Sequence, residues 1–125
     1  DVDSVEKAAN WRLEYEVDGI MIGRAAIGYP WIFREIKHFF ATGEKLAGPT
    51  LAERISVCRT HLEKSIEWKG VKTGIFEMRR HYANYFKGLP DFKEYRMRLV
   101  SLENVDDISS VLSEVEEKFE DFVAV

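Results

Sequence analysis

The chain has 125 residues, of which 46% are hydrophobic and 32% are charged, and its formal net charge is −4. These values favour a single packed domain and argue against a disordered tail, and no apolar run approaches the roughly 20 residues that cross a bilayer. The single cysteine, Cys58, leaves no partner for an internal disulfide, so we expect a reducing, cytoplasmic environment.

The first 28 residues are predicted to form one helix and one strand. Ser4 is expected to begin a helix that runs to about Tyr15, and the apolar stretch Asp18–Gly23 is predicted to be a strand. A lone parallel strand has no sheet to join, so residues 1–28 are expected to be a remnant of a larger α/β fold. The start at Asp1 rather than Met likewise indicates a trimmed chain.

From Pro30 onward, the pattern is helical. Thr50 and Asp91 each precede a glutamate by three residues, which predicts two capped helix starts, and Asn104 is expected to begin the last helix. Another helix is predicted over residues 71–86. We therefore expect a mainly α-helical fold, in which a bundle of about five helices follows the helix–strand remnant.

Charge is distributed unevenly along the chain. Residues 69–98 carry a net charge of +5, and residues 103–121 carry −7. At about 100° per residue, the helix that follows Gly70 separates an apolar arc from a basic one. Members of the basic arc are Lys72, Arg79, Arg80 and Lys87.

Two interpretations of this basic arc remain open. It can be the solvated face of an ordinary amphipathic helix, which is the usual role of a charged run. Alternatively it binds a nucleic acid, because one-sign surfaces release counterions from phosphates and arginine forks match phosphate oxygens. His81 and Tyr85 are further candidates for RNA contact, although Tyr85 also lies on the apolar arc, which is typical of core residues. The next helix adds Arg96 and Arg98.

Other residues offer less chemistry. Gly23-Arg24 at the end of the predicted strand can hold a phosphate, as loops after the last strands of (β/α)8 barrels do, or form a plain tight turn. Cys58 is expected to be a small buried hydrophobe. No metal-ligand set and no catalytic group of residues stands out, and the three tryptophans are expected to pack internally.

Two segments carry a family resemblance. DGIMIGRAAIGYPWIF resembles the end of the barrel in bacterial tRNA-dihydrouridine synthases, and MRRHYANYFKGLPDFKEYRMRL resembles the C-terminal helical domain of that family. The segments occur in the expected order, so the resemblance covers essentially the whole chain. It implies a division into residues 1–28, the end of a flavin-binding barrel, and residues 29–125, a helical tRNA-binding domain.

The resemblance also implies a function for the parent enzyme. Family members use FMN, reduced by NADPH, to convert a tRNA uridine to 5,6-dihydrouridine, and the helical domain grips tRNA while the target base is flipped. By this resemblance Gly23 and Arg24 bind the FMN phosphate. The tRNA would be contacted by Lys72, Arg79, Arg80, His81, Tyr85, Lys87, Arg96 and Arg98.

The resemblance leaves the chemistry incomplete in this chain. The family's catalytic cysteine lies upstream of the matched segments, and Cys58 does not correspond to it, so no catalytic residue is assigned and the chain alone is expected to be inactive. An unpaired apolar remnant is expected to favour a homodimer. The competing hypothesis is a non-catalytic helical domain whose basic helix binds an acidic protein partner.

Overall fold

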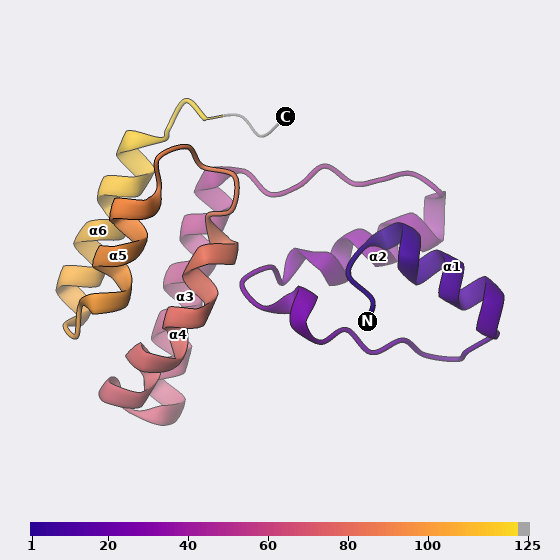
Figure 1. Cartoon of the computed structure of the whole chain (residues 1–125), viewed down its shortest axis with the longest axis horizontal. Coiled ribbons are helices and arrows are strands. Elements are labelled where there is room, and N and C mark those ends of the chain that lie inside the picture. The colour runs from indigo at the N-terminus through magenta and orange to yellow at the C-terminus, as the bar shows by residue number, and fades with distance from the viewer. Residues whose placement is uncertain (123–125) are drawn as a thin grey trace. The chain divides into compact units, whose positions relative to one another are not determined.

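The structure, a computed structural model, describes residues 1–122. Within them the chain forms six α-helices, one short 3-10 helix and no strand, so the prediction of a mainly α-helical bundle is confirmed (Figure 1). The chain divides into two compact units, residues 1–48 and residues 49–125. The boundary predicted between residues 28 and 29 stays a prediction about the domains of the family. In this structure the helix over residues 31–42 belongs to the first compact unit.

The first unit contains α1 (Val5–Tyr15), η1 (Arg24–Ala26) and α2 (Trp31–Thr42). Ser4 caps α1, because its hydroxyl accepts a hydrogen bond from the backbone N–H of Lys7 at 3.1 Å. Gly43 ends α2 at a φ of 75°, a backbone conformation that glycine adopts without strain. Helices α1 and α2 pack together over a small core, and a Glu6–Lys45 ion pair adds a surface contact. That core consists of Val2, Ala8, Trp31 and Ile32.

The strand predicted over Asp18–Gly23 is wrong for this chain. These residues have no regular secondary structure, and Met21 in their middle is 89% exposed. The physical reason is that a strand is defined by backbone pairing, and residues 1–122 offer this segment no neighbouring strand. Its apolar sequence is therefore left without the environment that would make it a strand.

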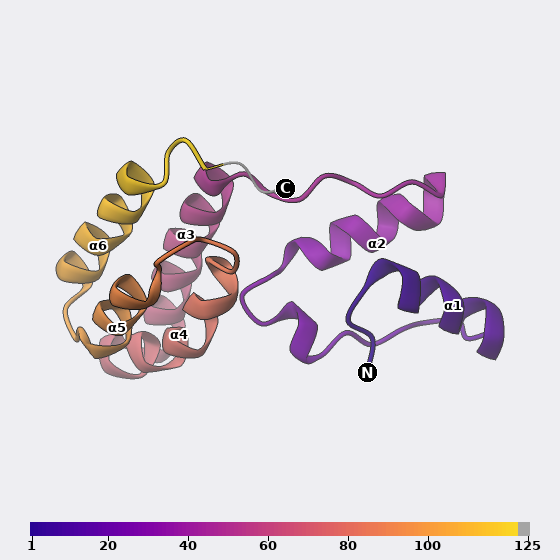
Figure 2. The same ribbon diagram turned by 45° about the horizontal axis from the view of Figure 1, so that its top comes forward.

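The second unit is built from α3 (Leu51–Lys69), α4 (Val71–Tyr85), α5 (Lys93–Ser101) and α6 (Val105–Lys118). Figure 2 shows α3 beside α4, and α6 beside α5, in agreement with Figure 1. Each helix turns one apolar stripe inward, as amphipathic periodicity requires. The fully buried side chains are Ile55, Cys58, Met78, Tyr82, Tyr85, Phe86, Leu99, Ile108, Val111, Leu112 and Val115.

Two of the three predicted caps in this unit are confirmed. The Thr50 hydroxyl accepts from the backbone N–H of Glu53 at 3.2 Å, and the Asn104 side chain accepts from the N–H groups of Asp106 and Asp107. The cap predicted at Asp91 is wrong. Asp91 has a φ of 55°, which takes it out of the capping geometry, and the position before α5 is occupied by Phe92 without a side-chain cap.

Candidate nucleic-acid interface

Helix α4 is held in place by an unusually close approach to α3. A Cβ atom added at Gly74 would lie 2.7 Å from the Cα of Ile66 and 2.9 Å from the backbone carbon of Ser65. The Ser65 hydroxyl also donates to the Gly74 carbonyl at 3.0 Å. Because the atoms facing Gly74 are backbone atoms, only glycine allows the two helices to approach this closely. This contact fixes which side of α4 faces outward.

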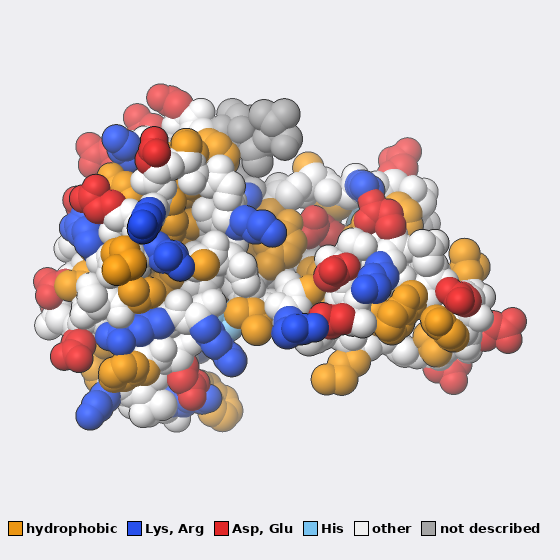
Figure 3. Space-filling model, in the orientation of Figure 1, with side chains coloured by type: hydrophobic (Ala, Val, Ile, Leu, Met, Phe, Trp, Pro, Cys, Tyr) orange, Lys and Arg blue, Asp and Glu red, His pale blue; other side chains and the backbone are white. Residues whose placement is uncertain are grey.

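The outward side of α4 carries positive charge. Lys72 and Arg80 are exposed on it, and Lys87 follows in the turn after the helix, where its carbonyl accepts from Arg54 Nη1 at 2.9 Å. We call Lys72, Arg80 and Lys87 the cationic face of α4. In Figure 3, Lys and Arg side chains gather over the part of the second unit formed by α4 and α5, with hydrophobic side chains among them. Three of the four members of the predicted basic arc, Lys72, Arg80 and Lys87, are therefore exposed in the structure.

Arg79, also predicted to bind RNA, has a different environment. Its side chain is half-buried, its Nη2 donates to the Leu102 carbonyl at 3.3 Å, and its Nε is buried without a hydrogen-bond partner among the described residues. The guanidinium carbon lies 4.2 Å from the centre of the Phe76 ring, a cation–π distance. Arg79 therefore ties α4 to the end of α5, and its charge is less available than that of Arg80.

Tyr85 and His81 lie on the side of α4 that faces α3. The Tyr85 side chain is 2% exposed, and its hydroxyl lies 2.9 Å from Nδ1 of His61. The rings of His61 and His81 meet edge to face with centres 4.5 Å apart. Tyr85 is thus a core residue in this structure, and a direct RNA contact by its ring would need the helix pair to open. Sequence spacing gave no signal of the histidine pair, because His61 and His81 come from different helices.

The histidine pair is held in its neutral form. Burial, together with the neighbouring positive charge of Arg80, lowers the pKa of His61. For His81, burial, His61 and Arg80 lower the pKa to about 4, against a smaller opposing effect of Glu77. Both groups are desolvated next to a guanidinium, which disfavours a second positive charge. At neutral pH these histidines therefore add no charge to the cationic face of α4.

On α5, the two predicted contact residues differ in availability. Arg96 has an exposed side chain. Arg98 forms a two-pronged ion pair with Glu114 of α6, with Nη2 2.6 Å from Oε2 and Nη1 3.3 Å from Oε1. This geometry is the fork-to-carboxylate arrangement that arginine also uses for phosphates. The acidic last helix therefore occupies Arg98.

Gly23 and Arg24 lie in the first unit, at the start of η1. Arg24 is 83% exposed, and its Nη2 donates to Oδ2 of Asp1 at 2.8 Å. A Cβ added at Gly23 would meet nothing within 4 Å, so the backbone there is open to a ligand. An open glycine next to an exposed guanidinium fits one edge of a phosphate site, at which the phosphate would compete with the Asp1 carboxylate.

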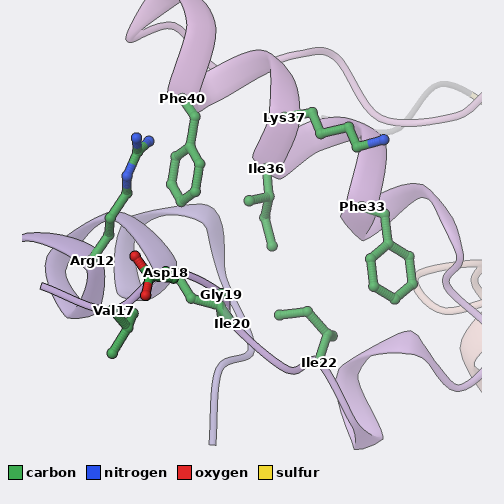
Figure 4. Close-up of a pocket in the computed structure, with 10 residues that line it drawn as sticks. All are labelled: Arg12, Val17, Asp18, Gly19, Ile20, Ile22, Phe33, Ile36, Lys37 and Phe40. Carbon is green, nitrogen blue, oxygen red and sulfur yellow. The ribbon is translucent and has the colours of Figure 1, made fainter. Parts of the chain in front are cut away.

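A groove in the first unit was not foreseen from the sequence. It lies between α2 and residues 17–22 and has a volume of about 520 Å³. Figure 4 shows Ile36 and Phe40 of α2 pointing toward that segment. Arg12 borders the groove, with its guanidinium carbon 4.8 Å from the centre of the Phe40 ring. Its lining is predominantly apolar, which follows from the absence of strand pairing in residues 18–23.

Other chemistry is limited among the described residues. Cys58 is fully buried, and burial raises its pKa to about 12, so it behaves as the small buried hydrophobe that was expected. No three His, Cys, Asp or Glu side chains of residues 1–122 cluster as metal ligands. None of the helices described combines the length and apolar character that a membrane crossing requires. Trp68, expected in the interior, is 81% exposed.

Together, these features define a helical module with exposed cations grouped on α4, beside the exposed Glu77, attached to a smaller unit that presents an open glycine–arginine pair. The model of the Dihydrouridine synthase (Dus) family matches residues 1–124. The chain therefore belongs to the dihydrouridine synthase family.

Individual relatives agree with this assignment. The tRNA-dihydrouridine synthase B of Shewanella oneidensis is 39% identical over 124 residues, which are 98% of this chain and 37% of that protein. A probable tRNA-dihydrouridine synthase 1 of Synechocystis sp. is 38% identical over 114 residues, 91% of this chain and 32% of that protein. The tRNA-dihydrouridine synthase B of Xanthomonas axonopodis pv. citri is 43% identical over 96 residues, 77% and 29% of the respective chains. The chain thus spans about a third of the length of the curated relatives it matches.

Proposed function

We propose that this chain is the C-terminal part of a cytoplasmic tRNA-dihydrouridine synthase, in which the second unit binds tRNA. One observation carries the proposal: Lys72, Arg80 and Lys87 are exposed together on one side of α4. Neutralising RNA phosphates releases condensed counterions, and exposed cations grouped on one side of a helix can neutralise several phosphates at once. Arg96 on the neighbouring helix extends the positive charge.

The reaction proposed for the parent enzyme is the FMN- and NADPH-dependent reduction of a tRNA uridine to 5,6-dihydrouridine. The bound flavin would supply the hydride. In this chain Gly23 and Arg24 would hold one side of the flavin phosphate, through the open backbone at Gly23 and the Arg24 guanidinium. No residue described here is assigned to proton or hydride transfer. We therefore expect the chain alone to be inactive and to contribute binding.

The helical unit would act by orienting the tRNA. Reduction of a base requires it to leave the helical stack, which costs a few kcal/mol of unstacking and unpairing energy. Phosphate contacts made at a distance from the target base can offset part of that cost, since they fix the position of the tRNA without reading its sequence. A four-helix unit suits this role because its packed core fixes the helices from which the charged side chains extend.

The test is tRNA binding by the 125-residue chain at two salt concentrations, beside a Lys72→Glu/Arg80→Glu double variant. Both side chains are exposed, so the variant should fold, whereas a substitution at Arg79 would also break the contact with Leu102. We expect affinity that falls steeply with salt and is lost in the double variant. A Lys64→Glu variant on α3, whose lysine is already paired with Glu67, is the control for a single charge reversal and is compared with Lys72→Glu and Arg80→Glu made singly.

The alternative is a helical domain that binds an acidic protein. The Arg98–Glu114 ion pair favours this alternative, because it shows a basic side chain of this unit bound to a carboxylate. If the chain does not bind tRNA even at low salt, that result would support this alternative over the proposed function. The homodimer stays a prediction, and analytical sedimentation of the chain would test it. The exposed apolar residues that would form its contact are Leu13, Val17 and Met21.

A further inference from the structure

The cationic face of α4 contains an aromatic ring that the charge pattern does not explain. Phe76 is 46% exposed, although its neighbours on this side of the helix are charged. Lys72 precedes it by four residues and Arg80 follows it by four, so the three side chains lie in one stripe, about 6 Å apart along the helix axis. Solvation of this face does not explain a phenyl ring at its centre, since an apolar ring exposed to water contributes no favourable free energy.

The ring is held by a neighbouring side chain. The Arg79 guanidinium carbon lies 4.2 Å from the ring centre, and Arg79 is itself anchored on the Leu102 carbonyl. Phe76 therefore has a fixed partner on one side, while nearly half of its surface remains open. A ring that is restrained in this way loses little side-chain entropy when a second flat group stacks on it.

We propose that Phe76 stacks on an unpaired base of the bound RNA, while Lys72 and Arg80 contact the phosphates on either side of that nucleotide. The inference rests on the proposed function and names a contact within it. A polyanion explains the two cations of the stripe, and only a ligand with flat aromatic groups also explains the ring between them. An acidic peptide would satisfy the cations and leave Phe76 without a partner. Single-stranded regions of an RNA offer both groups at the spacing of successive nucleotides.

The experiment measures binding of the 125-residue chain to tRNA, to a single-stranded oligouridylate and to inorganic polyphosphate, over a salt series. The variants are Phe76→Leu, which keeps an apolar side chain but removes the ring, and Phe76→Tyr, which restores a ring. Trp68→Leu is the control, because Trp68 is an exposed aromatic residue at the end of α3, outside the stripe. Thermal unfolding of each variant checks that the Arg79 contact is not required for folding.

We expect Phe76→Leu to weaken binding of tRNA and oligouridylate about tenfold, with no change in the salt slope, because stacking releases no counterions. Phe76→Tyr and Trp68→Leu should bind like the parent chain, and polyphosphate affinity should be the same for all. Equal RNA affinity of Phe76→Leu and the parent would overturn the stacking inference and leave the proposed function intact. Absence of salt-sensitive RNA binding by the parent would overturn both, and an equal loss for polyphosphate would show a purely electrostatic or structural effect, against stacking.

Discussion

The hydroxyl group of Tyr85 lies 2.9 Å from Nδ1 of His61, and this contact joins α4 to α3 inside the second unit. Family resemblance alone suggests Tyr85 as an RNA contact, but its side chain is 2% exposed. In the observed packing, its polar atom is used within the protein. The contact therefore predicts that Tyr85 affects stability and not RNA affinity.

Replacing Tyr85 with Phe should lower the free energy of unfolding by about 1 kcal/mol, because a part-buried hydrogen bond is lost. Urea denaturation measures this change. Tyr82→Phe is the matched control, since the Tyr82 hydroxyl is buried without a hydrogen-bond partner among the described residues and its removal should cost nothing. A Tyr85→Phe variant with full stability but weakened tRNA binding would return Tyr85 to the set of RNA contacts.

The histidine pair makes stability sensitive to acid. His81 titrates near its ordinary value of 6.5 in the unfolded chain, but its pKa is lowered to about 4 in the folded protein. Between these values the unfolded state binds more protons, so stability should be complete above about pH 6.5 and fall as the pH approaches 4. Melting temperatures across this range should show the decline for the parent chain.

A His81→Gln variant should show a flatter decline in the same pH range, because glutamine does not titrate. His38→Gln is the comparison variant, because it removes a histidine of the first unit and keeps the His61–His81 pair, so the decline caused by His81 should persist in it. Parallel curves for the parent chain and His81→Gln would mean that other groups cause the acid sensitivity. Arg80 and Glu77 are the charged neighbours that influence His81, so their variants would then be measured next.

Gly74→Ala tests the close approach of α3 and α4. Alanine is favoured over glycine within a helix by about 1 kcal/mol, so an unconstrained site would gain stability. Here the added methyl group would lie 2.7 Å from the Ile66 Cα, and backbone atoms cannot rotate away. We expect a net loss of about 1–3 kcal/mol in the free energy of unfolding. Thr73→Ala, one residue earlier and exposed, should be neutral or slightly stabilising; the same result at Gly74 would show that the helices separate without cost.

Sequence patterns predicted the helices of the second unit well because their signals are local. The cap at Thr50 and the cap at Asn104 depend on side chains within three residues of the backbone groups they bind. The apolar stripes similarly follow from the helical repeat. By contrast, Asp18–Gly23 would need pairing partners to become a strand, and no local pattern reports whether such partners exist.

The candidate interface was predictable only in part, for a similar reason. A projection at about 100° per residue places Lys72, Arg79 and Arg80 together in the basic arc, but in the structure Arg79 is half-buried. The Leu102 carbonyl, which follows the end of α5, accepts the hydrogen bond that turns Arg79 inward, and its position depends on how the helices pack. The ion pair of Arg98 with Glu114 spans 16 residues and also depends on how the helices pack. The sequence thus shows which charged residues are present, whereas only the tertiary structure shows which of them can reach a ligand.

The Arg98–Glu114 pair makes a last prediction about charge availability. A Glu114→Gln variant would remove the carboxylate that now holds both arms of the Arg98 guanidinium, and so free this group for phosphate. If the second unit binds tRNA as proposed, affinity should rise, and the salt slope should steepen by close to one phosphate contact. The pair is half exposed and screened by solvent, so the free energy of unfolding should change little.

Glu117→Gln provides the comparison that separates this specific release from a general change in charge. Glu117 is an exposed residue of the same helix, and its substitution alters the net charge by the same amount. A local release of Arg98 requires Glu114→Gln to strengthen tRNA binding clearly more than Glu117→Gln does. Equal effects of the two variants would mean that α6 acts through its overall negative charge, whereas no effect of either would place Arg98 outside the surface that contacts tRNA.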